Sequence, residues 1–336
     1  MKPNIATAEI AAVPYRDVDL PPVELVTETE PDGTIRLRSA QPLAEFDPNI
    51  IRGFYRQVAL HGDKTIYAQR RLETNGQRGD WVKQSFTDAK RDTRGIAQWL
   101  IDQGIGSNDA ILILSGNSVA HAMMRLGALT AGVPSCPISP NYSLLSGTFE
   151  RLKHVVDLIK PKVIFAESGR AHGEALSALD LSECLVVCDD PDDIEMTAFG
   201  YREICNTQPS PALDQHIDGT DVDVAAVYML TSGSTGMPKA VIQTQRMLST
   251  NMHQAYQVLG KAAGWSDVML DWLPWNHVSG AFNCFAAAVF GGTLYIDDGK
   301  PAPGLFDETI RNLREIPVPY FANVPVGFAY LVDALE

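Results

Sequence analysis

Residues 225–244 read AAVYMLTSGSTGMPKAVIQT, and the order of elements in this stretch decides how the rest of the chain is interpreted. The apolar run from Ala225 to Leu230 predicts a buried strand, and Ala240 to Thr244 predicts a second strand. Between them, the loop from Thr231 to Lys239 concentrates glycine, hydroxyl and lysine side chains. The stretch therefore predicts a strand, a glycine-rich loop and another strand.

The loop predicts a phosphate-binding site. Phosphate binding requires several convergent N–H donors, and glycine lets the backbone fold closely around the ligand. Serine and threonine hydroxyls add donors, and lysine adds positive charge. The residues that supply these groups are Thr231, Ser232, Gly233, Ser234, Thr235, Gly236 and Lys239.

The loop differs from a Walker P-loop, in which G-K-[ST] enters a helix, because Pro238 precedes Lys239 and an apolar strand follows. The other interpretation is a hairpin turn, rich in serine and glycine, that binds nothing. Two residues would suffice for such a turn, so the many hydroxyls and the lysine favour a ligand.

The composition is that of an ordinary globular protein of 336 residues, long enough for two packed subdomains or one large α/β domain. Its net charge of -14 and the lack of a basic run argue against binding to nucleic acid. The N-terminus lacks the apolar run of a secretory signal. The uncharged stretch from Val278 to Ile296 contains Asn283 and two adjacent glycines, so a helix, a turn and a strand explain it better than a membrane span.

The five cysteines form no CxxC pair, and their odd number leaves one unpaired in any disulfide scheme. This usage fits a reducing compartment, so we expect a cytoplasmic protein. Cys184 and Cys188 are spaced closely enough for a metal site, but no further histidine or cysteine lies nearby. Buried thiols are the favoured interpretation.

Short apolar runs alternate with longer helical patterns from Trp81 to the last residue, which predicts an α/β fold of layered βαβ units with largely parallel sheets. The polar stretch from Asp189 to Asp223 is the expected connection between two subdomains, with a new sheet after it. We expect strands at 110–114, 162–166, 184–188 and 268–273, and helices at 118–130, 148–159, 173–179 and 246–259. The expected regions are an extended N-terminal arm with one hairpin at Pro31–Gly33 (1–47), a first α/β subdomain (48–215) and an incomplete second α/β subdomain with the phosphate loop (216–336).

Several motifs resemble those of one known superfamily. Residues 228–241, YMLTSGSTGMPKAV, look like the signature of adenylate-forming enzymes, which include acyl-CoA synthetases, luciferases and the adenylation domains of peptide synthetases. Residues 273–280, LPWNHVSG, resemble the next motif of the superfamily, and residues 131–140 resemble an earlier one. The match is long, specific and in the expected order.

Two further segments narrow the resemblance. Residues 241–247, VIQTQRM, and 291–301, GGTLYIDDGKP, look most like bacterial feruloyl-CoA synthetases, which implies an aryl or cinnamic acid as substrate. Many members of the superfamily carry histidine where this chain has Gln245, so no role of that histidine is carried over. Feruloyl-type enzymes tend to have Thr-Phe-Gly where this chain has Val278-Ser279-Gly280, so the acid can differ from ferulate.

The resemblance implies an ATP-dependent carboxylic acid:CoA ligase that acts through an acyl adenylate, with Mg²⁺ bound to the ATP. The loop would hold the β- and γ-phosphates, and Thr235 would reach the Mg²⁺ through ATP. His277 follows a predicted strand, where open α/β sheets place ligands, and by resemblance it would border the carboxylate and the adenylate. The following helix would line the acid pocket with Val278, Ser279, Phe282 and Asn283.

The resemblance extends from about Pro48 to the end of the chain, whereas members of the superfamily continue further. They carry a Y-G-x-T-E segment, a ribose-binding aspartate, a hinge and a small C-terminal domain with the adenylation lysine. We therefore expect this chain to be the N-terminal part of such a ligase and to complete neither half-reaction alone. A fatty acid is the alternative substrate, a carrier-protein pantetheine the alternative thiol, and a standalone nucleotide-binding module or a degenerate scaffold the alternative function.

Overall fold

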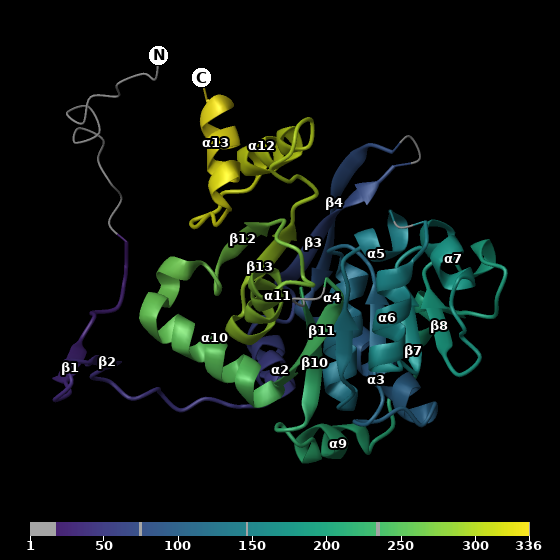
Figure 1. Ribbon diagram of the computed structural model, residues 1–336, viewed down its shortest axis with the longest axis horizontal. Coiled ribbons are helices and arrows are strands. Elements are labelled where there is room, and N and C mark those ends of the chain that lie inside the picture. Colours follow the sequence, from purple (N-terminus) through teal and green to yellow (C-terminus); the bar gives the residue numbers. More distant parts are fainter. Residues whose placement is uncertain (1–17, 74–75, 146, 233–235, 336) are drawn as a thin grey trace.

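The computed structural model describes residues 18–73, 76–145, 147–232 and 236–335. These residues form two sheets that share a core, and an N-terminal hairpin set apart from both (Figure 1). Strands β1 (Leu25–Thr29) and β2 (Ile35–Ser39) pair antiparallel around the turn predicted at Pro31–Gly33, so the expected hairpin is confirmed. Residues 1–17 of the predicted arm lie outside the described part.

The first sheet has seven strands, all parallel to their neighbours except β11, which runs antiparallel to β10 at one edge. Its central strands are short apolar runs that are buried on both faces, as is typical of a parallel sheet covered by helices. In spatial order the strands are β11 (Pro238–Thr244), β10 (Ala225–Ser232), β6 (Ser135–Pro137), β5 (Ile111–Leu114), β7 (Val163–Ala166), β8 (Leu185–Cys188) and β9 (Phe199–Gly200).

Alternate residues of β5 point into two separate cores. Leu112 and Leu114 pack on one face against α6 (Glu150–Ile159) and α7 (Gly169–Ser177). Ile111 and Ile113 belong to the larger core, which lies between the two sheets. The helices that contribute to this larger core include α2 (Ile50–His61), α3 (Phe86–Asp102), α4 (Val119–Ala131) and α11 (Val278–Phe290).

The second sheet has four strands, of which β4 alone runs antiparallel to its neighbour. Two helices from the last part of the chain lie beside this sheet (Figure 1). They are α12 (Phe306–Glu315) and α13 (Pro325–Asp333). In spatial order the strands are β12 (Val268–Asp271), β13 (Thr293–Ile296), β3 (Thr65–Leu72) and β4 (Arg78–Ser85).

The remaining elements connect the sheets or cover their edges. Helix α10 begins after Thr244, whose hydroxyl accepts a hydrogen bond from the Met247 amide. These elements are α5 (Asn141–Leu144), η1 (Pro191–Asp193), α8 (Tyr201–Cys205), α9 (Leu213–Gly219), α10 (Gln245–Leu259) and η2 (Gly260–Ala263).

The predicted α/β class is confirmed, and so are the expected strands and helices, with ends that shift by a few residues. The stretch 278–296 forms α11, a turn at Gly291 with φ 76° and β13, as expected. No helix in the described ranges has the length and apolarity needed to span a bilayer.

The expectation of a new sheet after Asp223 is wrong, because β10 pairs with β6 and extends the first sheet. The polar stretch before it contains buried anchors, including Tyr201, Ile204 and Leu213, so it packs into the core instead of serving as a free connection. The second sheet in turn combines β3 and β4 from the first part of the chain with β12 and β13. The boundary at 215/216 stays a prediction, although the sheets do not divide there.

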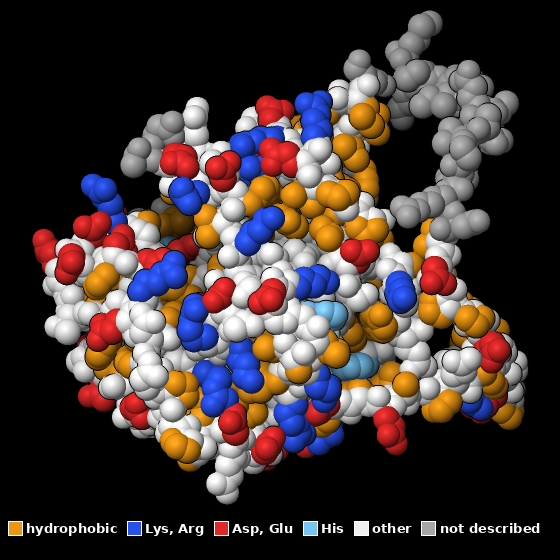
Figure 2. Space-filling model, turned by 180° about the vertical axis from the view of Figure 1, so that it is seen from behind, with side chains coloured by type: hydrophobic (Ala, Val, Ile, Leu, Met, Phe, Trp, Pro, Cys, Tyr) orange, Lys and Arg blue, Asp and Glu red, His pale blue; other side chains and the backbone are white. Residues whose placement is uncertain are grey.

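The surface carries mixed charges. On the face shown in Figure 2, basic and acidic side chains are intermingled, and hydrophobic side chains gather near α13. The exposed apolar residues of α13 include Val326, Phe328 and Val332.

Candidate functional site

The carboxyl ends of parallel strands from both sheets open into one cavity of about 520 Å³. In open α/β sheets, this is the edge at which ligands bind. The first sheet contributes the residues that follow β5, β6 and β7, and the second contributes those that follow β12 and β13. The lining of the cavity includes Arg70, Arg78, Asn117, His121, Glu167, Trp275, His277, Asp297 and Asp298.

His277 lies in the loop between β12 and α11, at the N-cap position of α11. Its side chain is exposed, and its amide donates to the carbonyl of Pro274 at 3.0 Å. Trp275, two residues before it, is buried against the ring of His121, with 5.2 Å between the ring centroids. The loop is therefore anchored by Trp275 while His277 faces the cavity, as the strand-end position predicts.

His121 is held neutral. Burial, with the nearby charge of Arg125, lowers the pKa of His121 to about 3. Its Nδ1–H donates to the carbonyl of Gly116 at 2.8 Å, which leaves Nε2 as an acceptor without a hydrogen-bond partner among the described residues. The cavity wall thus contains a neutral imidazole whose Nε2 can accept a hydrogen bond from a ligand.

Glu167 follows β7 and lines the same cavity. Burial raises the pKa of its carboxyl, although Ser115 donates a hydrogen bond to it at 2.8 Å. Ionisation of this carboxyl is therefore unfavourable, and a ligand group that donates a hydrogen bond to it would stabilise the ionised form.

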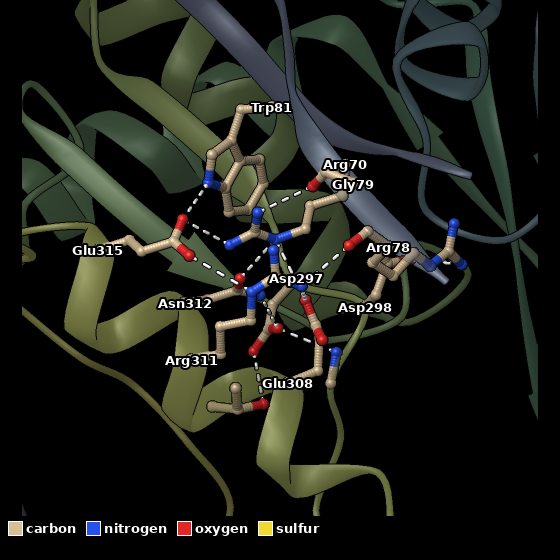
Figure 3. Close-up of polar contacts among 12 residues, drawn as sticks. Arg70, Arg78, Gly79, Trp81, Asp297, Asp298, Glu308, Arg311, Asn312 and Glu315 are labelled. Carbon is tan, nitrogen blue, oxygen red and sulfur yellow. Dashed lines mark hydrogen bonds and ion pairs between the residues drawn. The ribbon is translucent and has the colours of Figure 1, made fainter. Parts of the chain in front are cut away.

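The arginines of the cavity are already paired. The Arg70 guanidinium bonds to Glu308 at 3.1 Å and Glu315 at 2.6 Å, and Arg78 bonds to Asp298 at 2.8 Å. Figure 3 shows these side chains converging between β3, β4 and α12. The positive charges of this cluster are neutralised within the protein, so the cluster joins elements instead of presenting free cations to a phosphate.

Asp297 lies at the centre of the same network. Its carboxylate accepts from the Gly299 amide at 2.9 Å, the Thr309 hydroxyl at 2.7 Å and the Asn312 amide group at 2.8 Å. Burial raises the pKa of Asp297 despite these donors. These hydrogen bonds hold the turn that follows β13 against α12.

A second cavity, of about 320 Å³, lies between β11, α10 and α11 and is mostly apolar. One face of α11 forms a wall of it, because Val278, Ala281, Phe282 and Phe285 are spaced at i, i+3, i+4 and i+7. The opposite wall includes Met247, Leu248 and Met252 of α10. This cavity begins beside His277, because Val278 is the next residue.

The predicted phosphate loop joins β10 to β11. Thr231 and Lys239 are exposed and face each other across this pair of strands, and Gly236 has a φ of 82° that glycine adopts without strain. Gly233, Ser234 and Thr235 lie outside the described residues, and Ser232 ends β10. The structure therefore places the two ends of the loop and leaves its roles as predictions.

The four residues predicted for the acid pocket separate into two groups. Val278 and Phe282 line the apolar cavity, whereas Ser279 is exposed and does not line it. Asn283 is bound within the protein: its amide group donates to Asp271 at 2.7 Å and accepts from the Trp265 indole at 3.2 Å.

Sequence reasoning missed Asn117 and His121, which line the first cavity. It also missed two buried residues that support the site, Arg125, which donates to the carbonyl of Trp275, and Asp271, which accepts from Asn283. One signal was present, since Arg125 is a charged residue in the middle of an otherwise apolar helical run. Within the described residues, no group of three His, Cys, Asp or Glu could hold a metal ion.

Comparison with known proteins gives the family. Residues 54–336 match the sequence profile described as AMP-binding enzyme. The chain belongs to this family. This AMP-binding enzyme has curated relatives: a human long-chain-fatty-acid–CoA ligase is 21% identical over 330 residues, covering 94% of this chain and 43% of the relative. A naringenin synthase from Pestalotiopsis fici is 24% identical over 258 residues, covering 74% of this chain and 9% of the relative.

Solved structures share the fold of this AMP-binding enzyme. A benzoate CoA ligase from Burkholderia xenovorans LB400 matches with a TM-score of 0.64 and 19% identity, covering 84% of this chain and 51% of that one. A fatty acyl-adenylate ligase from L. pneumophila matches with a TM-score of 0.58 and 16% identity, covering 80% and 42%. The chain thus spans about half or less of the length of these proteins.

Proposed function

We propose that this AMP-binding enzyme supplies the ATP- and acid-binding surfaces of an adenylate-forming acid–thiol ligase. A carboxylate oxygen of the acid attacks the α-phosphorus of ATP, the bond to the bridging oxygen breaks, and pyrophosphate leaves. The CoA thiol then attacks the acyl carbon of the adenylate, loses its proton, and AMP leaves. Catalysis of such steps consists mainly of positioning and charge neutralisation.

One observation carries the proposal. The predicted phosphate loop starts at the end of β10, and the neighbouring strand β6 ends at the cavity lined by His277. Lys239 and the loop would hold the β- and γ-phosphates, and His277 would border the carboxylate. The chemistry and the family assignment favour this function over a standalone nucleotide-binding module or a degenerate scaffold.

The proposed acid is of the aryl or cinnamic type. The apolar cavity beside His277 is walled by Phe282 and Phe285, and its volume lies within the range of small-molecule pockets. Feruloyl-type specificity is the finer proposal, and a fatty acid is the alternative, since one relative is a long-chain-fatty-acid–CoA ligase. We propose CoA as the acceptor thiol and a cytoplasmic location, which the five free cysteines fit.

Mg²⁺ would enter with ATP and neutralise charge on its phosphates. Thr235 is the residue that we propose to reach it, and this residue lies outside the described part of the chain. The other loop residues would bind the phosphates directly.

The ATP site is tested by isothermal titration of the chain with MgATP. We expect binding that Lys239→Ala weakens about tenfold or more, because a charge-assisted hydrogen bond is lost. Lys261→Ala, at an exposed lysine in η2, is the matched control and should leave the affinity unchanged. No binding of MgATP would favour the degenerate scaffold, and equal binding by both variants would contradict the assigned loop.

The acid site is tested with the sulfamoyl analogue of cinnamoyl-AMP, which mimics the adenylate and needs no turnover. We expect it to bind more tightly than MgATP, because it fills the proposed acid cavity and the AMP part of the nucleotide site together. His277→Ala should weaken the analogue but not MgATP. An affinity for the analogue no greater than for AMP would favour a standalone nucleotide-binding module.

A further inference from the structure

Arg125 of α4 is fully buried and only partly hydrogen-bonded. Its exposed fraction is 0%, and Nη1 donates to the carbonyl of Trp275 at 3.4 Å. Nε and Nη2 are also buried and have no hydrogen-bond partner among the described residues. Leaving buried donors unpaired is costly, so this arrangement requires a reason.

No negative charge compensates Arg125 within the described residues. It takes part in none of their ion pairs. Its titratable neighbours are His121, Tyr67, Cys136 and Cys284. Burial lowers the pKa of His121 to about 3, raises that of Cys136 to about 12 and that of Cys284 to about 11, and raises that of Tyr67 well above its usual value. These groups are neutral at pH 7, so the guanidinium is a buried cation without a counter-charge.

The guanidinium lies just behind the apolar cavity. Its central carbon is 4.3 Å from the ring centre of Phe285, and that ring forms part of the cavity wall. The cavity follows one face of α11 from Val278, beside His277, to Phe285, which is about 10 Å at 1.5 Å per residue. An acid with its carboxylate near His277 would therefore point its far end at Phe285 and Arg125.

We propose that Arg125 selects acids that carry an oxygen anion or acceptor at the end remote from the reacting carboxylate. The Phe285 ring turns aside, and the remote oxygen binds the unpaired Nε and Nη2, replacing a cation–π contact with a charge-assisted pair. Because these two donors form a fork, a second carboxylate fits best and a phenolic oxygen fits next. This inference rests on the proposed function, since it assumes that the acid occupies the apolar cavity.

Three acids that differ only at the remote position test the inference: cinnamate, 4-hydroxycinnamate and 4-carboxycinnamate. We expect titration of the chain to show the two oxygen-bearing acids binding at least tenfold more tightly than cinnamate, with the relative order identifying the oxygen source. Arg125→Met, which preserves length and packing, should abolish the difference. Arg202→Met is the matched control, because Arg202 also stacks on an aromatic ring, that of Tyr201, away from the cavity.

Thermal unfolding without ligand gives a second readout that needs no acid. A buried guanidinium that is paired only when a ligand binds destabilises the ligand-free protein. Arg125→Met should therefore unfold at an equal or higher temperature than the parent. A clearly lower unfolding temperature, or failure of this variant to fold, would show a structural role and overturn the inference. Equal binding of all three acids by the parent would also overturn it, whereas binding of none of them would count against the proposed function instead.

Discussion

Asn117 and Trp275 are joined by a hydrogen bond across 158 residues of sequence, the Trp275 amide donating to Asn117 Oδ1 at 3.0 Å. The amide group of Asn117 donates in turn to the carbonyl of Leu273 at 2.9 Å. Asn117 follows β5 of the first sheet, and the other two residues follow β12 of the second. One side chain thus holds the loop of His277 against the opposite sheet.

Replacing Asn117 with alanine should loosen this loop. Both hydrogen bonds are lost and two backbone groups remain unpaired, so we expect the free energy of unfolding to fall by about 1–3 kcal/mol. Hydrogen exchange of the Trp275 amide should accelerate while the amides of β12 stay protected. Asn117→Asp keeps the acceptor and loses the donor, and it should preserve the protection of Trp275. Unchanged exchange in the alanine variant would contradict the role of Asn117.

Gly280 lets α11 lie directly against the same loop. A Cβ atom at this position would stand 2.2 Å from the carbonyl oxygen of Leu273 and 2.5 Å from that of Pro274. Because both neighbours are backbone atoms, Gly280→Ala must displace the loop, and we expect a loss of about 1–3 kcal/mol in stability. The same variant should weaken binding of the adenylate analogue.

Gly106→Ala is the control for this prediction, since a Cβ atom there meets nothing within 4 Å. It should leave unfolding and binding nearly unchanged. If Gly280→Ala behaved like the control, the close approach of α11 to the loop would not exist in solution.

The strands could be predicted from the sequence where their burial is complete. The runs 110–114 and 163–166 are continuously apolar and bounded by polar residues, which is the pattern of central parallel strands. The assignment of strands to sheets could not be predicted in the same way. For example, β3 pairs with β13, although the strands of the first sheet lie between them in the sequence. Nothing in the residues of either strand indicates this partner.

Residues of the site could be predicted from the sequence only where a single motif specifies their position. His277 follows its strand directly, so its place at a sheet edge can be read from neighbouring residues. Asn117 and Arg125 act on the same loop from other elements, and nothing in their own segments specifies the contact. Asn283 was predicted as a pocket residue from the resemblance, which places the helix after His277 along the acid pocket, but its amide group donates to the buried carboxyl of Asp271.

We expect Arg70 to contribute more to stability than the other arginines of the network in Figure 3. Its side chain is 2% exposed and bonds to Glu308, Glu315 and Asn312. Arg70→Met leaves these acceptors without their donor, but the two carboxylates are partly exposed and water can replace part of the loss. We expect a decrease of about 2 kcal/mol in the free energy of unfolding, measured by urea denaturation.

Arg311→Met is the matched variant for this test. Arg311 contacts the same two carboxylates, at 3.4 Å and 3.3 Å, but its side chain is 43% exposed. A surface pair contributes little, so we expect a change below about 1 kcal/mol. Equal effects of the two variants would show that the burial of Arg70 does not decide the strength of this network.

Asp271 should make stability depend on pH. Burial raises the pKa of its carboxyl from 3.8 to about 6, although Asn283 and the Leu273 amide donate to it. Between these pH values the folded protein holds a proton that the unfolded chain releases, so the free energy of unfolding falls as pH rises. The full cost, about 3 kcal/mol at most, is present above pH 6.

Urea denaturation of the parent and of Asp271→Asn between pH 4 and pH 7 isolates this contribution, because the other carboxyls are common to both proteins. Asparagine does not titrate, so the parent should lose stability relative to the variant as pH rises through this window. In the variant, the new amide group at position 271 faces the amide group of Asn283, which lowers the stability of the variant by an amount that does not depend on pH. The pH dependence of the stability difference between the two proteins is therefore unaffected. A difference between the two proteins that stays constant over this range would mean that Asp271 is ionised throughout and that its two donors outweigh its burial.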